Sequence, residues 1–142
     1  MPTKDVAMIV HEGVQCLDVA GPLDVFAEAN RFLPEDDGYR CLILAETTEL
    51  IRASNGMPMA AHCEFADAAR VFHTVLVAGG PGLPDRSADE AMSIWLRAWG
   101  VRAKRYGSIC TGAFALGDAG LLDGRLVTTH WQNADQLAER FP

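Results

Sequence analysis

Short apolar runs alternate with longer stretches of helical period along the chain. Residues 6–10 read VAMIV, an uninterrupted apolar run of the kind that fills a central parallel strand. Apolar residues then recur at helical spacing from Asp18 to Phe32, and PEDDG at residues 34–38 ends this stretch. The pattern predicts a strand and then a helix that starts near Asp18, with Pro22 in its first turn.

The alternation continues through the middle of the chain. Residues 39–46 and 75–78 are two further apolar runs and are expected to be strands. Between them, Asn55-Gly56 separates two short extended pieces, which predicts a small β-hairpin at one sheet edge.

The second half of the chain is expected to repeat the same order. Ser87 is a suitable N-cap for a helix to about Ala103. The apolar face of that helix is predicted to be Ala91, Ile94, Trp95, Ala98 and Val101. A strand at 106–110, a short helix ending near Gly120, a strand at 125–130 and a last helix at 131–141 are expected to follow.

Strands that alternate with helices of this length predict an α/β fold. The expected architecture is a flavodoxin-like or Rossmann-like doubly wound parallel sheet, a sandwich with helices on both faces. The 142 residues suit a single domain, and 49% hydrophobic content is enough to form a buried core.

Charge and composition narrow the function classes. Twelve basic and nineteen acidic residues give a net charge of −7, so these residues are not expected to bind DNA. No apolar run approaches the roughly 18 residues of a membrane span, which predicts a soluble protein. The N-terminus has no signal-like segment and the four cysteines form no CxxC pair, which favours reduced thiols in the cytoplasm.

No cofactor or metal ion is expected. The spacing of His62, Cys63 and His73 matches no usual zinc-ligand pattern. The turn at residues 79–82, Gly-Gly-Pro-Gly, follows neither the dinucleotide-binding pattern nor the Walker pattern, which disfavours phosphate binding.

Cys110 is the strongest candidate for chemistry. It lies in GSICTG, where a strand pattern changes into a helical one between the small residues Ser108 and Gly112, as a nucleophile elbow requires. A position before a helix favours the thiolate. The alternative is a small buried hydrophobe, the reading we keep for Cys41, while Cys16 and Cys63 are taken as structural.

The predicted topology brings three strand ends together. Ligands collect at the carboxyl ends of parallel strands, and Cys110, His130 and the pair Gly79-Gly80 each follow a predicted strand. The N–H groups of Gly80 and Thr111 are expected to form an oxyanion hole. His130 either faces this site or bonds a neighbouring carbonyl.

Three segments together resemble the DJ-1/PfpI superfamily, which has the class I glutamine amidotransferase-like fold. They are GVQCLDVAGPLDVFAEAN at 13–30, VLVAGGPG at 75–82 and SICTGAFALGDAGLLDGRLVTTHW at 108–131. Within the superfamily the resemblance is to the N-terminal domain of AraC-type transcriptional regulators of the GlxA kind. It implies a homodimer, Cys110 in the elbow, and Asp18 as a partly protonated acid beside the sulfur. By itself, Asp18 also suits a helix cap.

The resemblance leaves three functions open. Thr111 stands where protease-like members carry histidine, which argues against peptidase activity. The Cys-Thr-Gly and Thr-Thr-His-Trp motifs occur both in the regulators and in isocyanide hydratase. In that enzyme such a cysteine attacks the carbon of the isocyanide, and the nearby acid helps to protonate this carbon. Oxidation sensing through a sulfenic acid at Cys110 is the third.

The regulator is the function that we expect. A small molecule, effector or substrate, is expected to bind at the catalytic candidates Cys110, Asp18 and His130 and the ligand-binding candidates Gly79, Gly80, Thr111 and Gly112. The family's domain normally runs on through a further strand and helix, so the domain at 1–142 is expected to be truncated at its C-terminus. DNA contact is assigned to a helix-turn-helix region downstream.

Overall fold

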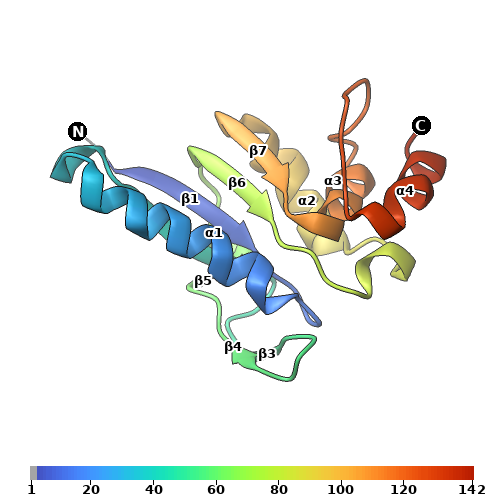
Figure 1. Cartoon of the computed structure of the whole chain (residues 1–142), viewed down its shortest axis with the longest axis horizontal. Coiled ribbons are helices and arrows are strands. Elements are labelled where there is room, and N and C mark those ends of the chain that lie inside the picture. The colour runs from blue at the N-terminus through green and yellow to red at the C-terminus, as the bar shows by residue number, and fades with distance from the viewer. Residues whose placement is uncertain (1–2) are drawn as a thin grey trace.

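A parallel sheet of five strands forms the centre of the molecule. The computed structural model describes residues 3–142, and the order of the strands across the sheet is β5-β2-β1-β6-β7, with every neighbouring pair parallel (Figure 1). The expected parallel α/β fold is therefore confirmed. The bounds are β1 Lys4–Ile9, β2 Tyr39–Ala45, β5 Cys63–Glu64, β6 Thr74–Val77 and β7 Arg105–Ser108.

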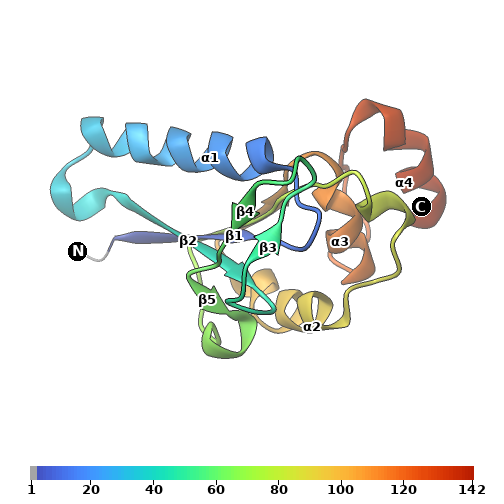
Figure 2. The same cartoon turned by 90° about the horizontal axis from the view of Figure 1, so that it is seen from below.

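Helices cover both faces of the sheet. Helix α1 (Cys16–Ala29) lies on one face, while α2 (Glu90–Ala98) and α3 (Ala113–Asp118) lie on the other (Figure 2). The final helix, α4 (Ala134–Arg140), lies near α3. Each face of the sheet has its own hydrophobic core, because successive side chains along a central strand point to opposite faces of the sheet. The α1 side buries Met8, Val10, Val14 and Val19, and the other side buries Phe72, Trp95, Leu96 and Phe114.

Helix α1 begins earlier than predicted. Its N-cap is Gln15, and Asp18 lies inside the first turn rather than before it. The side chain of Asp18 accepts a hydrogen bond from the Gly79 amide instead of capping its own helix. Pro22 lies inside the helix and not in its first turn.

The predicted limits of α2 are also wrong, and its predicted buried face is correct only in part, since Trp95 is buried and Ala91 packs against the core. The N-cap is Asp89, whose carboxylate accepts the Met92 amide proton at 3.0 Å, so Ser87 remains outside the helix. Ile94 is 54% exposed and Val101 is 45% exposed. The residues that α2 buries are Met92, Ser93, Trp95 and Leu96.

The Asn55-Gly56 hairpin forms a sheet of its own. Strands β3 (Ile51–Arg52) and β4 (Pro58–Met59) pair antiparallel and are separate from the five-stranded sheet. A five-residue loop joins them, and Gly56 adopts a positive φ of 89° in it. The predicted hairpin at Asn55-Gly56 is therefore confirmed, but its strands are joined by five residues, whereas the sequence predicted a two-residue turn.

The strand expected at 125–130 does not form. These residues follow α3 as an irregular segment, and Leu126 is fully exposed. Within residues 3–142, no strand pairs with the outer edge of β7. An extended segment without a partner to complete its hydrogen bonds is not a strand. We refer to residues 125–133, which lead into α4, as the arm.

The carboxyl ends of β1, β6 and β7 meet at one edge of the sheet. The loop after β1 leads into α1, and the turn after β7 leads into α3, so both helices start beside the end of β6 (Figure 1). In the described part of the chain, no helix combines the length and apolar character needed to cross a membrane.

Candidate functional site

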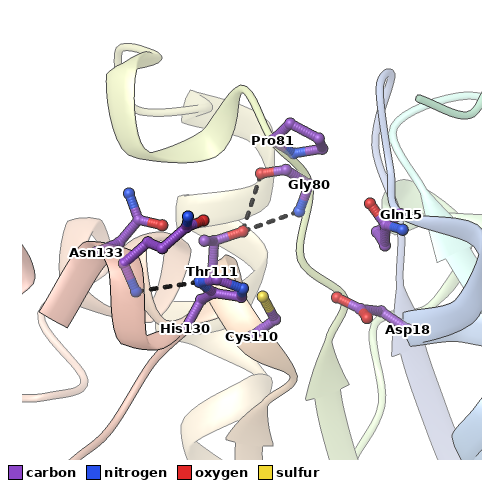
Figure 3. A pocket seen from close by; sticks show the side chains of 9 residues that line it. Gln15, Asp18, Gly80, Pro81, Cys110, Thr111, His130 and Asn133 are labelled. Carbon is purple, nitrogen blue, oxygen red and sulfur yellow. Dashed lines mark hydrogen bonds between the residues drawn. The ribbon is translucent and has the colours of Figure 1, made fainter. Parts of the chain in front are cut away.

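A cavity of about 470 Å³ lies at this edge of the sheet. Four segments form its walls: the start of α1, the loop after β6, the turn after β7 and the arm (Figure 3). The lining residues are Gln15, Asp18, Gly80, Pro81, Cys110, Thr111, His130, Gln132 and Asn133. Cys110, Asp18 and His130, three residues far apart in the sequence, therefore line one cavity.

Cys110 has an unusual backbone conformation. Its φ is +54°, and the other described residues with positive φ are glycines. For a residue with a Cβ, this conformation costs about 1–3 kcal/mol and persists only where the surroundings hold it. The hydroxyl of Thr129 donates to the Cys110 carbonyl at 2.9 Å, so the arm helps to hold this turn.

Asp18 faces Cys110 across the cavity. Figure 3 shows the carboxylate of Asp18 on α1 pointing across the cavity toward Cys110, whose sulfur points into the cavity from the turn after β7. Burial raises the pKa of Asp18 above its usual value of 3.8, although the Gly79 amide and the charge of His130 oppose the rise. The carboxyl group is thus held closer to its protonated form, as a proton donor beside a thiol requires.

Thr111 joins the turn after β7 to the loop after β6. Its buried hydroxyl donates to the Gly80 carbonyl at 2.9 Å and accepts the Gly80 amide proton at 3.0 Å. The expectation of a free Gly80 N–H is therefore wrong, because Thr111 Oγ1 already occupies this donor. Thr111 instead fixes the distance between the two segments that flank Cys110.

Gly79 and Gly112 permit close backbone approach and are not among the residues that line the cavity. A Cβ on Gly79 would lie 2.6 Å from Asp18 Oδ2 and 3.0 Å from the Thr111 nitrogen. A Cβ on Gly112 would lie 2.1 Å from the Val77 carbonyl oxygen. The absence of side chains lets α1, β6 and the turn after β7 converge on one point.

His130 reaches the cavity from the arm rather than from a strand end. Its Nδ1 accepts the Gln132 amide proton at 3.2 Å and so caps the short 3-10 helix Trp131–Asn133. Its ring stacks on Trp131 with the centroids 5.6 Å apart. His130 thus lines the cavity, the first of the two alternatives open from the sequence, although the predicted strand does not form.

Sequence reasoning missed several lining residues. Gln15 precedes α1, Pro81 follows Gly80, and Gln132 and Asn133 belong to the 3-10 helix of the arm. The one sequence feature that could have indicated these residues is their nearness in the sequence, since each lies within three residues of a predicted site residue. No characteristic sequence spacing identifies asparagine or glutamine residues as lining residues of a site.

The lining restricts which ligands fit. It includes one carboxyl group, three carboxamides and an imidazole, and no lysine or arginine. A phosphate or carboxylate would find no permanently cationic side chain. Within the described residues, no group of three or more His, Cys, Asp or Glu side chains is placed to hold a metal ion.

An Asp18→Asn substitution is expected to stabilise the folded chain slightly at neutral pH. Because the folded pKa of Asp18 is raised, its ionised form costs folding free energy above that pKa. Asparagine retains an oxygen for the Gly79 amide and has no charge to bury. The gain in Tm should shrink as the pH falls through the raised pKa of folded Asp18 toward the ordinary value of 3.8, because a protonated Asp18 has no charge to bury. Thermal melts across this range test it, and a pH-independent loss of Tm would contradict the burial.

Comparison with known protein families identifies this architecture. Residues 4–141 match the DJ-1/PfpI family. The chain also superposes on a ThiJ/PfpI family protein from Pseudomonas syringae with a TM-score of 0.85 and 28% sequence identity, covering 99% of this chain and 55% of that protein.

Three relatives cover nearly all of this chain. An uncharacterized protein of the cpoL 5′ region of Streptomyces lividans is 42% identical, over 96% of this chain and 94% of its own length. The isonitrile hydratase of Pseudomonas putida is 31% identical, over 93% of this chain and 54% of the hydratase. The HTH-type transcriptional regulator CdhR of Pseudomonas aeruginosa is 30% identical, over 99% of this chain and 40% of the regulator. The chain thus spans about half or less of the two relatives with named functions.

Proposed function

Since this chain belongs to the DJ-1/PfpI family, we propose that it is the small-molecule-sensing domain of a cytoplasmic transcriptional regulator. The effector binds in the cavity beside Cys110. The observation that carries the proposal is the match to CdhR, which takes in 99% of this chain but only 40% of that regulator. This match means that a transcriptional regulator contains a region similar to nearly the whole of this chain.

The cavity lining supports a polar, nitrogen-containing effector. Asp18 offers a carboxyl group, and Gln15, Gln132 and Asn133 offer both donors and acceptors. Amine, amide and hydroxyl groups pair with this set. Three of the lining residues belong to the arm, so an effector that bridges α1 and the arm would alter how the arm is held.

A library of amine- and amide-containing metabolites is expected to contain compounds that raise the Tm of this chain. At a hundredfold excess over Kd, binding adds about 2.7 kcal/mol of stability. A Gln132→Trp variant, with the new indole on the exposed rim of the cavity, should lose this stabilisation. Arg97→Trp, on the exposed surface of α2, is the matched control and should retain it. Equal stabilisation of all three proteins would reject the cavity as the effector site.

The DNA-binding part of the proposal concerns a downstream basic region. Because the net charge of this chain is −7, contacts with DNA phosphates are assigned to a basic region downstream of it. An immunoblot of the source cells with an antibody to this 15.4 kDa chain tests it. A native band of about twice this mass or more supports the regulator, whereas a band near 15.4 kDa would remove the DNA-binding half of the proposal.

A cysteine-dependent hydratase is the second candidate. The feature that favours it is the strained Cys110 turn, a nucleophile elbow in this proposal, with Asp18 opposite, whose pKa burial raises. The thiolate would attack the carbon of an isonitrile, Asp18 would protonate that carbon, and water would then displace the sulfur to release a formamide. Cys110→Ser should abolish turnover of a simple alkyl isonitrile, while Cys16→Ser, outside the cavity, should not. If the wild-type chain does not convert the isonitrile, this candidate function is rejected.

A further inference from the structure

A second cavity, of about 290 Å³, lies at the carboxyl ends of β1 and β2. Its walls come from the end of β1, the loop between β2 and β3, the 3-10 helix Phe65–Asp67 and the segment before α2. It shares no lining residue with the cavity at Cys110. Because ligands collect at the carboxyl ends of parallel strands, this second cavity is a candidate binding site of its own.

The inner lining of the second cavity is apolar. Val10, Ala45, Ile51 and Phe65 line it, and all four side chains are buried. Leu50 also lines the cavity but is 74% exposed, so it lies at the mouth. A ligand with an apolar body would therefore contact buried side chains on the inside and Leu50 on the outside.

His11 lies between the second cavity and the cavity at Cys110. Its buried ring has Nδ1 3.1 Å from the Glu12 carbonyl oxygen and Nε2 3.1 Å from the Ala78 carbonyl oxygen. A Cβ on Gly80, which lines the cavity at Cys110, would lie 2.9 Å from His11 Cε1. Burial lowers the pKa of His11 below its usual value of 6.5, so the ring contributes no positive charge to the second cavity at neutral pH.

The charged side chains of the second cavity are mostly acidic. The lining includes one guanidinium, that of Arg86, and the carboxylates of Glu12, Glu46, Glu49 and Asp89. Within residues 3–142, the ion pairs use other side chains, so no ion pair neutralises these carboxylates. Arg86 Nη2 instead donates to the main-chain carbonyl of Glu12 at 2.8 Å. A bound cation would relieve the repulsion between the unpaired carboxylates.

The carboxylates belong to separate segments of the chain. Glu12 follows β1, Glu46 and Glu49 follow β2, and Asp89 is the N-cap of α2. In the described part of the chain, no three or more His, Cys, Asp or Glu side chains are placed to hold a metal ion together. This spread, with the apolar inner lining, favours an organic cation over a metal ion.

We propose that the second cavity binds a small organic cation, a primary ammonium group on an apolar body, independently of the effector site at Cys110. The ammonium group pairs with the carboxylates of Glu46 and Glu49 at the mouth, where neither has a cationic partner within residues 3–142. The apolar body lies on the buried inner lining. The carboxylates select the charge and the lining selects the shape.

Benzylammonium is the probe that tests this proposal, because it joins a primary ammonium group to one apolar ring. In an NMR titration of the isotope-labelled chain, it is expected to shift the amide signals of Val10, Ile51 and Phe65 and to reach saturation. Benzyl alcohol has nearly the same size without the charge and should bind at least about tenfold more weakly.

The double variant Glu46→Gln with Glu49→Gln should weaken benzylammonium binding by about tenfold, because two attractive charge contacts are lost. Both side chains are exposed, so the fold should be retained. Glu35→Gln with Asp36→Asn is the matched control. It makes the same change in net charge on the exposed 3-10 helix before β2 and should leave the affinity unchanged.

Four results would overturn the proposal. Either no saturable shift with benzylammonium or equal binding of benzyl alcohol would show that the cavity does not select an organic cation. Equal weakening by the control pair would show that net charge alone attracts the probe. If Gln132→Trp abolished binding while the double variant retained it, the probe would occupy the cavity at Cys110. The sensing proposal would then stand, and the proposal of a second site would fall.

Discussion

A Gly112→Ala variant is expected to lose about 3 kcal/mol of folding free energy and to melt roughly 10 °C below wild type. The new Cβ would lie 2.1 Å from the Val77 carbonyl oxygen and 3.2 Å from that of Ala78. These are backbone atoms at the end of a central strand, so α3 must move away from β6 to relieve the overlap. Chemical denaturation and calorimetry measure the loss, and the cavity at Cys110 should deform with the turn.

Gly21→Ala is the matched control for that experiment. Gly21 lies inside α1, and a Cβ there would meet no heavy atom within 4 Å. Alanine in a helix interior is favoured over glycine by about 0.5–1 kcal/mol, so this variant should be slightly more stable than wild type. If Gly112→Ala retained wild-type stability, the close approach of α3 to β6 would be wrong.

Cys110 is expected to react with iodoacetamide at least about tenfold faster than Cys41 and Cys63 at neutral pH. Burial raises the pKa of both the Cys41 and the Cys63 thiol, which suppresses their thiolates. Cys110 lines an open cavity and is held in a turn that exposes its sulfur to that cavity. Mass spectrometry of the labelled peptides over time gives the four rates separately.

Denatured protein provides the internal standard for this labelling. When the chain is unfolded, the reactivities of the four cysteines should converge, because the differences derive from burial and from the cavity. A native Cys110 that stays unlabelled while Cys41 or Cys63 reacts would mean that the sulfur is not accessible from the cavity.

The sheet was predictable because its central strands are buried on both faces. Residues 6–10 and 75–78 have to be apolar throughout, and such runs stand out in a sequence. Helix limits were harder, since tertiary contacts decide them. Asp18 suits a cap locally, yet in the fold its carboxylate serves the Gly79 amide. Residues 125–130 have the composition of a strand but no neighbouring strand to pair with.

Some of the residues that line the cavity were named from the sequence, and others were not. Cys110 was identified from a strand-to-helix change between small residues, and Asp18 from its place in a family motif. The carboxamides of Gln132 and Asn133 reach the cavity only because the arm folds back over the turn after β7. No local sequence pattern predicts that the arm lies against the cavity, whereas the three-dimensional structure shows it.

The most direct test of the sensing function is the rate of Cys110 alkylation in the presence of a metabolite that raises the Tm. If the effector occupies the cavity, saturating metabolite should slow labelling of Cys110 by at least about tenfold and leave Cys16 unchanged. Stabilisation without protection of Cys110 would place the effector elsewhere and would contradict the proposal that this cavity is the sensing site.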